Sequence, residues 1–163
     1  SIESAFGSKI FVNGYLLNNQ MTDFSLNPVD ADGRPLINRV EAGKRPRSSM
    51  SPMLVFKEGR PVLAVGAPGG SAIINFVAKT LVGTLWWDMD IQAAIELPNM
   101  GSRNRATELE RGTALNRTAA TLKAMGHEVK EVDFPSGLHG VMWTSNGLEG
   151  GADPRREGVA AGR

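Results

Sequence analysis

Two short segments of this chain could together build an anion-binding site. Ser48-Ser49 supplies adjacent hydroxyl groups, and Gly69-Gly70 supplies a flexible backbone that can aim consecutive N–H groups at one anion. Between them, the apolar runs 53–56 and 61–65 flank a Gly-containing turn, which predicts a β-hairpin. Because a hairpin puts its outer ends side by side, we expect the serines and the glycines to lie close together. Paired N–H groups of this kind form oxyanion holes, which stabilise the charge of an acyl-transfer intermediate.

Each segment also has a simpler interpretation. Pro68-Gly69-Gly70 is typical of an ordinary strand-to-helix turn, and Ser48-Ser49 of an ordinary loop. Apolar residues at helical spacing over 71–87 nevertheless place the glycines immediately before a predicted helix. A helix N-terminus presents unpaired N–H groups and the positive end of a dipole, so this position suits negative charge.

Four motifs that occur together give the chain a family resemblance. In sequence order they resemble the small, C-terminal subunit of the γ-glutamyltransferases, N-terminal-nucleophile enzymes that cleave themselves into two chains. The resemblance runs from Ser1 nearly to the end. The motifs are Leu-Leu-Asn-Asn-Gln-Met with Asp-Phe (16–24), Arg-Ser-Ser-Met-Ser-Pro (47–52), Pro-Gly-Gly-Ser (68–71) and Ala-Asp-Pro-Arg-Arg (152–156).

The resemblance implies a nucleophilic N-terminal Thr whose own α-amino group acts as base. Such an amine has a pKa near 7.7–8.0 and accepts a proton close to neutral pH. That Thr is absent here, and Ser1 matches a second Thr whose hydroxyl hydrogen-bonds the nucleophile. An alternative is that Ser1 is itself the nucleophile, but the match through Glu3 and Phe6-Gly7 argues against it. We therefore expect the nucleophile upstream of Ser1, and this chain alone to be inactive.

Further site residues follow from the same motif match. Gly69-Gly70 matches the oxyanion-hole glycines, and Ser48-Ser49 matches the pair that binds the substrate α-carboxylate. Gln20 and Asp23 match residues that hold the α-amino group, Asp23 through a charge-assisted hydrogen bond. Without the motif match, Asp23 would read as a loop carboxylate that caps its own backbone. Glu3 stands where the family commonly has Asn, and a second carboxylate favours an amino-bearing donor although two carboxylates repel.

Local patterns predict the secondary structure. Strands are expected at 1–6 and 9–17, and the loop 27–47 has no periodicity. Helices are expected at 71–87, at 88–97 with Asp88 as N-cap, and at 113–125. Strands are expected at 127–134 and 138–144, with a hairpin at Asn146-Gly147, and Trp86-Trp87 is expected in the core. Strands followed by helices and then by further strands favour a layered α+β fold. The resemblance implies the C-terminal half of a four-layer αββα sandwich of N-terminal-nucleophile type.

Composition narrows the remaining possibilities. The 163 residues fit one domain, 1–163, and the 19 Gly and nine Pro suggest that some segments pack on another chain. Eighteen basic and 17 acidic residues give a net charge of +1, which does not indicate a nucleic-acid partner. The absence of Cys and the presence of only two His exclude a thiol nucleophile and a Cys- or His-cluster metal site. No apolar run is long enough for a membrane span.

The expected function is transfer or hydrolysis of the γ-glutamyl group of glutathione or other γ-glutamyl amides through an acyl-enzyme. The resemblance implies a large N-terminal subunit of the same precursor as partner, no cofactor, and a periplasmic or extracellular location. Two alternatives stay open: a glutaryl or cephalosporin-type acylase of the same family, and a non-catalytic homologue that binds amino acids.

Overall fold

The computed structural model describes residues 2–3 and 6–162. The chain divides into two compact units, Ser1–Ser48 and Ser49–Arg163. In the first unit, β1 (Phe11–Val12) and β2 (Tyr15–Leu16) form a tight antiparallel hairpin, and η1 (Gln20–Asp23) follows. The turn residues Asn13 and Gly14 both have positive φ, as a two-residue hairpin turn requires.

The prediction of a strand at 1–6 is wrong at residues 2, 3 and 6, which are the residues of this range that the structure describes. Residues 2 and 3 belong to no strand, and Phe6 and Gly7 have φ of 68° and 55°, so the chain turns where a strand would continue. Within 27–47 the structure describes only an isolated bridge between Val29 and Pro35, consistent with the missing periodicity.

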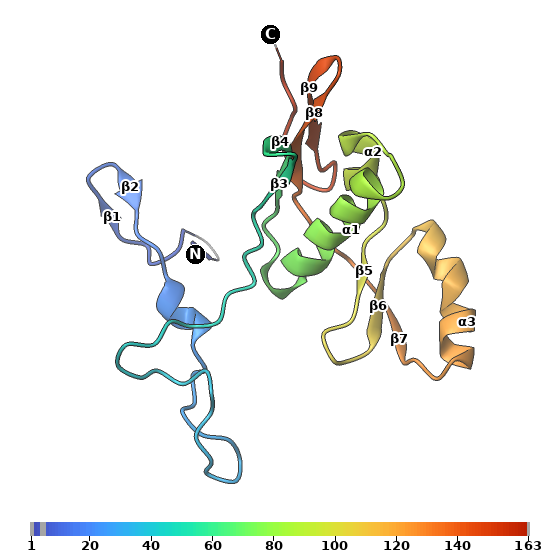
Figure 1. Cartoon of the computed structure of the whole chain (residues 1–163). Coiled ribbons are helices and arrows are strands. Elements are labelled where there is room, and N and C mark those ends of the chain that lie inside the picture. The colour runs from blue at the N-terminus through green and yellow to red at the C-terminus, as the bar shows by residue number, and fades with distance from the viewer. Residues whose placement is uncertain (1, 4–5, 163) are drawn as a thin grey trace. The chain divides into compact units, whose positions relative to one another are not determined.

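The second unit is built on a four-stranded antiparallel sheet in the order β3-β4-β8-β9 (Figure 1). Its strands are β3 (Met53–Lys57), β4 (Arg60–Gly66), β8 (His139–Thr144) and β9 (Gly147–Ala152). Pairing of Met53 with Val65 confirms the predicted hairpin and puts its outer ends side by side. The second predicted hairpin, at Asn146-Gly147, is confirmed by the β8–β9 pairing.

Two helices cover one face of this sheet. They are α1 (Ile73–Leu85), preceded by η2 (Gly70–Ala72), and α2 (Ile91–Glu96). The core between helices and sheet contains Leu63, Phe76, Val77, Ile91, Ile95 and Leu138, all at most 2% exposed. Gly140 and Gly151 are paired on β8 and β9, and a Cβ on either would lie within 3.0 Å of an Ile91 or Ile95 side chain. These glycines therefore let α2 approach the sheet closely.

A smaller sheet completes the second unit. Its order is β5-β6-β7, with β5 (Met100–Gly101) antiparallel and β7 (Val129–Val132) parallel to β6 (Thr107–Glu110). The crossover from β6 to β7 contains η3 (Ala114–Thr118) and α3 (Ala119–Ala124), because a parallel pair needs a long connection. The α+β prediction is confirmed. Among the helices that the structure describes, none has both the length and the hydropathy that a membrane span requires.

Two predictions around α1 and α2 are wrong. Trp86 and Trp87 are 75% and 62% exposed, because they follow the last turn of α1, beyond the stripe that packs on the sheet. The N-cap of α2 is Asp90, which accepts a hydrogen bond from Ala93 N (2.8 Å), while Asp88 has a positive φ that forms the preceding turn.

A buried charge cluster joins the C-terminal segment to the rest of the second unit. Arg155 donates to both carboxylate oxygens of Glu110 (2.5 and 2.9 Å) and to Asp153 (3.0 Å). It also donates to the carbonyls at the end of α2, where Lys79 donates to Ile95 O and Leu97 O. Burial, followed by the nearby Arg155 charge, lowers the pKa of Lys79 to about 8.

Asp153 is the innermost member of this charge cluster. Its side chain is 0% exposed, and it accepts hydrogen bonds from Ser136 Oγ (2.6 Å) and from the N–H groups of Leu138 and Arg155. Burial by itself would raise the pKa of Asp153, but these hydrogen bonds outweigh it and hold the pKa below its usual value. The cluster thus fixes the 134–138 loop as well as the C-terminal segment.

We predict that Arg155→Ala destabilises the protein by about 3–5 kcal/mol, because it leaves two buried carboxylates without their cation. Urea denaturation of the full-length protein measures this loss. The control is Lys130→Ala, which breaks a pair with Glu128 whose side chains are 62% and 67% exposed, and should cost about 0–1 kcal/mol. Equal losses in the two variants would contradict the prediction.

Candidate active site

The glycine segment, defined as Pro68–Ser71, links β4 to α1. Gly69 and Gly70 have φ of 135° and 59°, conformations that favour glycine. Phe76, on the first turns of α1, lies directly beneath Gly69, where an added Cβ would be 2.6 Å from its ring. Nothing lies within 4 Å of the corresponding position on Gly70. One glycine is therefore packed and the other faces open space.

The N–H groups of Gly69 and Gly70 donate to no protein acceptor within the described residues. The first intrahelical bonds begin after them, from Ala72 N to Gly69 O and from Ile73 N to Gly70 O. Two adjacent donors thus stand at the positive end of the 13-residue helix α1. This geometry is compatible with binding an oxyanion.

Side chains from distant parts of the second unit hold the glycine segment. Pro68 packs against Gly137, where an added Cβ would be 2.9 Å from the proline ring. Arg103 Nη1 donates to Ser71 Oγ (2.7 Å), and Arg103 is itself paired with Glu108. A cavity of about 190 Å³ is lined by Gly69, Phe76, Arg103, Glu108 and residues 132–135. Arg103 and Glu108 were not predicted as site residues, because no local sequence pattern relates Arg103 to Ser71, which lies 32 residues away.

Ser49 lies at the same end of the hairpin as the glycines. Pro52 lies opposite Gly66, so the segments that continue outward from the two strands start side by side. Ser49 O accepts a hydrogen bond from Ser51 Oγ (3.2 Å), which shapes the approach to β3. Ser48 belongs to the first unit, and its meeting with the glycines stays a prediction.

The first unit brings Glu3, Gln20 and Asp23 together. Gln20 Nε2 donates to Asp23 Oδ2 (2.7 Å), and the Glu3 carboxyl lies near enough to the Asp23 carboxyl to have its pKa raised by it. Asn19 fixes the backbone of Glu3 by accepting from its N–H (2.8 Å) and donating to its carbonyl. Asn38 donates to Asp23 O (2.8 Å). The motif around η1 and the N-terminal residues therefore form one polar cluster, to which sequence reasoning had not assigned Asn19 and Asn38.

Glu3 and Asp23 influence each other electrostatically. Partial burial and then the neighbouring Asp23 carboxyl raise the pKa of Glu3 above its ordinary value of 4.5. The two carboxyl groups therefore repel each other when both are ionised. A bound ammonium group would relieve this repulsion, so the cluster is chemically suited to a cation. Ser1, predicted to assist catalysis, lies outside the described residues.

Comparison with known proteins gives the family. A sequence model described as Gamma-glutamyltranspeptidase matches residues 1–163. The chain belongs to the gamma-glutamyltranspeptidase family. It is 35% identical to the glutathione hydrolase proenzyme of Bacillus subtilis over 99% of this chain, and 31% identical to the acylase ACY 1 proenzyme of a Pseudomonas species over 98%. The crystal structure of the Helicobacter pylori gamma-glutamyltranspeptidase T380A mutant superposes with a TM-score of 0.80 and 30% identity, covering 96% of this chain and 90% of that one.

The fold is therefore that of the gamma-glutamyltranspeptidase family, an α+β fold of N-terminal-nucleophile hydrolase type. The chain spans 27% of the length of the Bacillus subtilis relative and 28% of the acylase.

We predict that Gly70→Ala lowers kcat of the full-length enzyme about 100-fold, because a residue with Cβ is strained at a φ of 59° and would turn the N–H away from the oxyanion. Steady-state kinetics on a γ-glutamyl anilide measures this. Gly112→Ala is the control, since Gly112 has a φ of 72° and equally open space but lies outside the glycine segment. A similar kcat for both variants would contradict an oxyanion role.

We predict that Glu3→Asn raises KM for a γ-glutamyl donor about tenfold near neutral pH, through loss of a charge-assisted contact with the donor ammonium. The difference from the parent should shrink as pH falls through the raised pKa of Glu3, because the protonated carboxyl no longer attracts the cation. KM measured against pH tests both statements. The control is Asp32→Asn, which removes an exposed carboxylate of the same unit and should leave KM unchanged. A KM for Glu3→Asn equal to that of the parent would contradict contact between Glu3 and the donor.

Proposed function

We propose that this chain is part of the small subunit of an enzyme that cleaves γ-glutamyl amides, such as glutathione, and passes the γ-glutamyl group to water or an amine. The observation that carries the proposal is the pair of N–H groups at Gly69 and Gly70, which find no acceptor among the residues that the structure describes, in a chain of the gamma-glutamyltranspeptidase family. These donors would stabilise the oxyanion that forms when a nucleophile attacks the amide carbonyl. The nucleophile is an N-terminal Thr upstream of Ser1, and the hydroxyl of Ser1 supports it.

The α-amino group and the α-carboxylate of the substrate are proposed to bind different residues. Gln20, Asp23 and Glu3 would hold the α-amino group, because two carboxylates and an amide carbonyl all accept hydrogen bonds from an ammonium. Ser48 and Ser49 would donate hydroxyl hydrogen bonds to the α-carboxylate. The paired carboxylates of Glu3 and Asp23 favour an amino-bearing donor over a plain glutaryl group. This proposal involves no cofactor.

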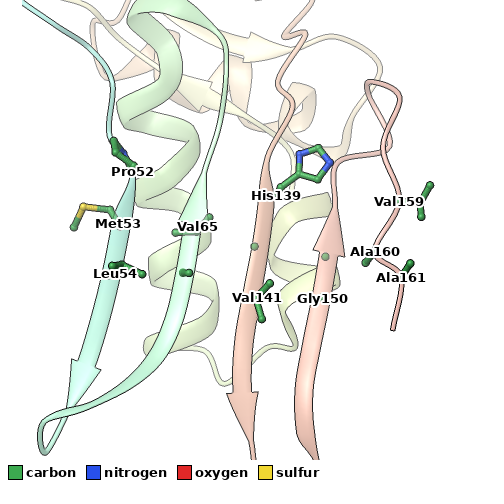
Figure 2. Close-up of a pocket in the computed structure, with 13 residues that line it drawn as sticks. Pro52, Met53, Leu54, Val65, His139, Val141, Gly150, Val159, Ala160 and Ala161 are labelled. Atoms are coloured by element: carbon green, nitrogen blue, oxygen red, sulfur yellow. The ribbon is translucent and has the colours of Figure 1, made fainter. Parts of the chain in front are cut away.

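The partner would be the large N-terminal subunit of the same precursor. The face of the four-stranded sheet opposite α1 and α2 carries Leu54, Ala64, Val141 and Gly150, which are neighbours across the four strands. They line a cavity of about 780 Å³ together with Val159, Ala160 and Ala161 of the C-terminal segment (Figure 2). An apolar sheet face of this kind needs a covering layer. The large subunit would supply it as the second sheet of a four-layer αββα sandwich, of which residues 1–163 form one part. Export to the periplasm or cell surface is part of the same proposal.

An acylase of the same family is the second candidate, because the chain is 31% identical to the acylase ACY 1 proenzyme. Release of the aniline from γ-glutamyl and glutaryl anilides by the full-length, self-processed protein separates the two. We predict a kcat/KM at least about tenfold higher for the γ-glutamyl compound, from the added charge-assisted contact to its α-amino group. Preference for the glutaryl compound would indicate an acylase. Failure to turn over either compound would indicate the third candidate, a non-catalytic homologue that binds amino acids. A residue other than Thr at the predicted cleavage point would indicate the same.

A further inference from the structure

Arg103, on the turn between β5 and β6, connects the glycine segment to the small sheet. Its Nη2 donates to both carboxylate oxygens of Glu108 on β6 (2.8 and 2.6 Å), and its Nη1 donates to Ser71 Oγ (2.7 Å). Ser102 Oγ, which donates to Arg105 O (2.9 Å), shapes the turn that presents the guanidinium. Because Glu108 holds Nη2 while Nη1 of the same planar guanidinium reaches Ser71 Oγ, the position of Ser71 is coupled to the small sheet.

The glycine segment needs such a constraint. An oxyanion hole is effective only when its donors are held in place before the charge develops. Gly69 packs on Phe76, but no described atom lies within 4 Å of the position that a Cβ on Gly70 would take. Two consecutive glycines also give the most flexible backbone available. The Ser71 hydroxyl is the first side-chain anchor after Gly70. Arg103 and Gly69 also line the same cavity of about 190 Å³, so the guanidinium lies close to the glycine segment.

We propose that Arg103 is a positioning residue for the γ-glutamyl transfer reaction: held by Glu108, it fixes Ser71 and thereby the N–H groups of Gly69 and Gly70. The inference rests on the proposed function for its kinetic consequence, but its structural consequence is independent of it. A donor that is loosened rather than removed should weaken stabilisation of the transition state more than binding of the ground state. Arg103 therefore acts on kcat and not on KM.

The kinetic test uses the full-length, self-processed enzyme with a γ-glutamyl anilide as substrate. Each measured rate is divided by the amount of enzyme that has processed itself. Arg103→Ala and Ser71→Ala should each lower kcat about tenfold with KM within twofold of the parent. The double variant should be no slower than the slower single variant, because both changes break one contact. Arg103→Lys keeps the charge but has one nitrogen in place of the Nη1 and Nη2 that hold Ser71 and Glu108, so it should recover only part of the rate. Lys130→Ala, which breaks an exposed ion pair on the same sheet, is the matched control and should leave kcat unchanged.

A second measurement does not depend on activity. Amide hydrogen exchange of the 66–76 segment should be faster in Arg103→Ala and Ser71→Ala than in the parent, and unchanged in Lys130→Ala. If Arg103→Ala does not process, the same two measurements on Glu108→Gln, which weakens the contact with Arg103, replace it. Faster exchange with no turnover in the parent would uphold the positioning role and contradict the proposed function.

Three results would overturn the positioning role. The first is unchanged exchange in the 66–76 segment of the variants. The second is a change confined to KM, which would mean that Arg103 contacts substrate. The third is a double variant whose loss in kcat is the product of the two single losses.

Discussion

The buried ion cluster of Arg155 with Glu110 and Asp153 is the constraint on which the second unit depends. It joins three elements that are far apart in sequence: the strand β6, the end of α2 and the C-terminal segment. Each carboxylate is satisfied by more than one donor, which is what allows charges to remain buried. Through Ser136 the cluster also fixes the 134–138 loop, and Gly137 of that loop packs on Pro68 at the start of the glycine segment.

The candidate oxyanion site is therefore supported from two directions. The C-terminal cluster acts on its first residue, Pro68, and the Glu108–Arg103 pair acts on its last, Ser71. Between them, Phe76 fixes Gly69 from below and packs edge-to-face on Phe134, with ring centroids 5.7 Å apart. Rigid support around a flexible glycine pair places its donors accurately, and their N–H groups meet no acceptor in the described part of the chain.

Local sequence patterns identified the elements that carry the site. The 53–66 hairpin, helix α1 and the Asn146-Gly147 turn each have short-range signals, and the structure contains all three. Trp86 and Trp87 were misplaced because hydrophobicity alone does not say where the packed stripe of a helix ends. The contacts of Arg103 and Arg155 could not be predicted, since they join residues 32 and 45 positions apart and depend on how the two sheets pack. The roles of Glu3, Gln20 and Asp23 were predicted from the order of the family motifs. That these three residues lie close together in the first unit could not be predicted from local periodicity.

The most direct measurement of the central claim is a crystal structure of the full-length, self-processed protein trapped as a γ-glutamyl acyl-enzyme. We expect the acyl carbonyl oxygen to lie about 2.7–3.1 Å from both Gly69 N and Gly70 N. An acyl oxygen that faces other donors, with Gly69 N and Gly70 N bound only to water or to the protein, would contradict it.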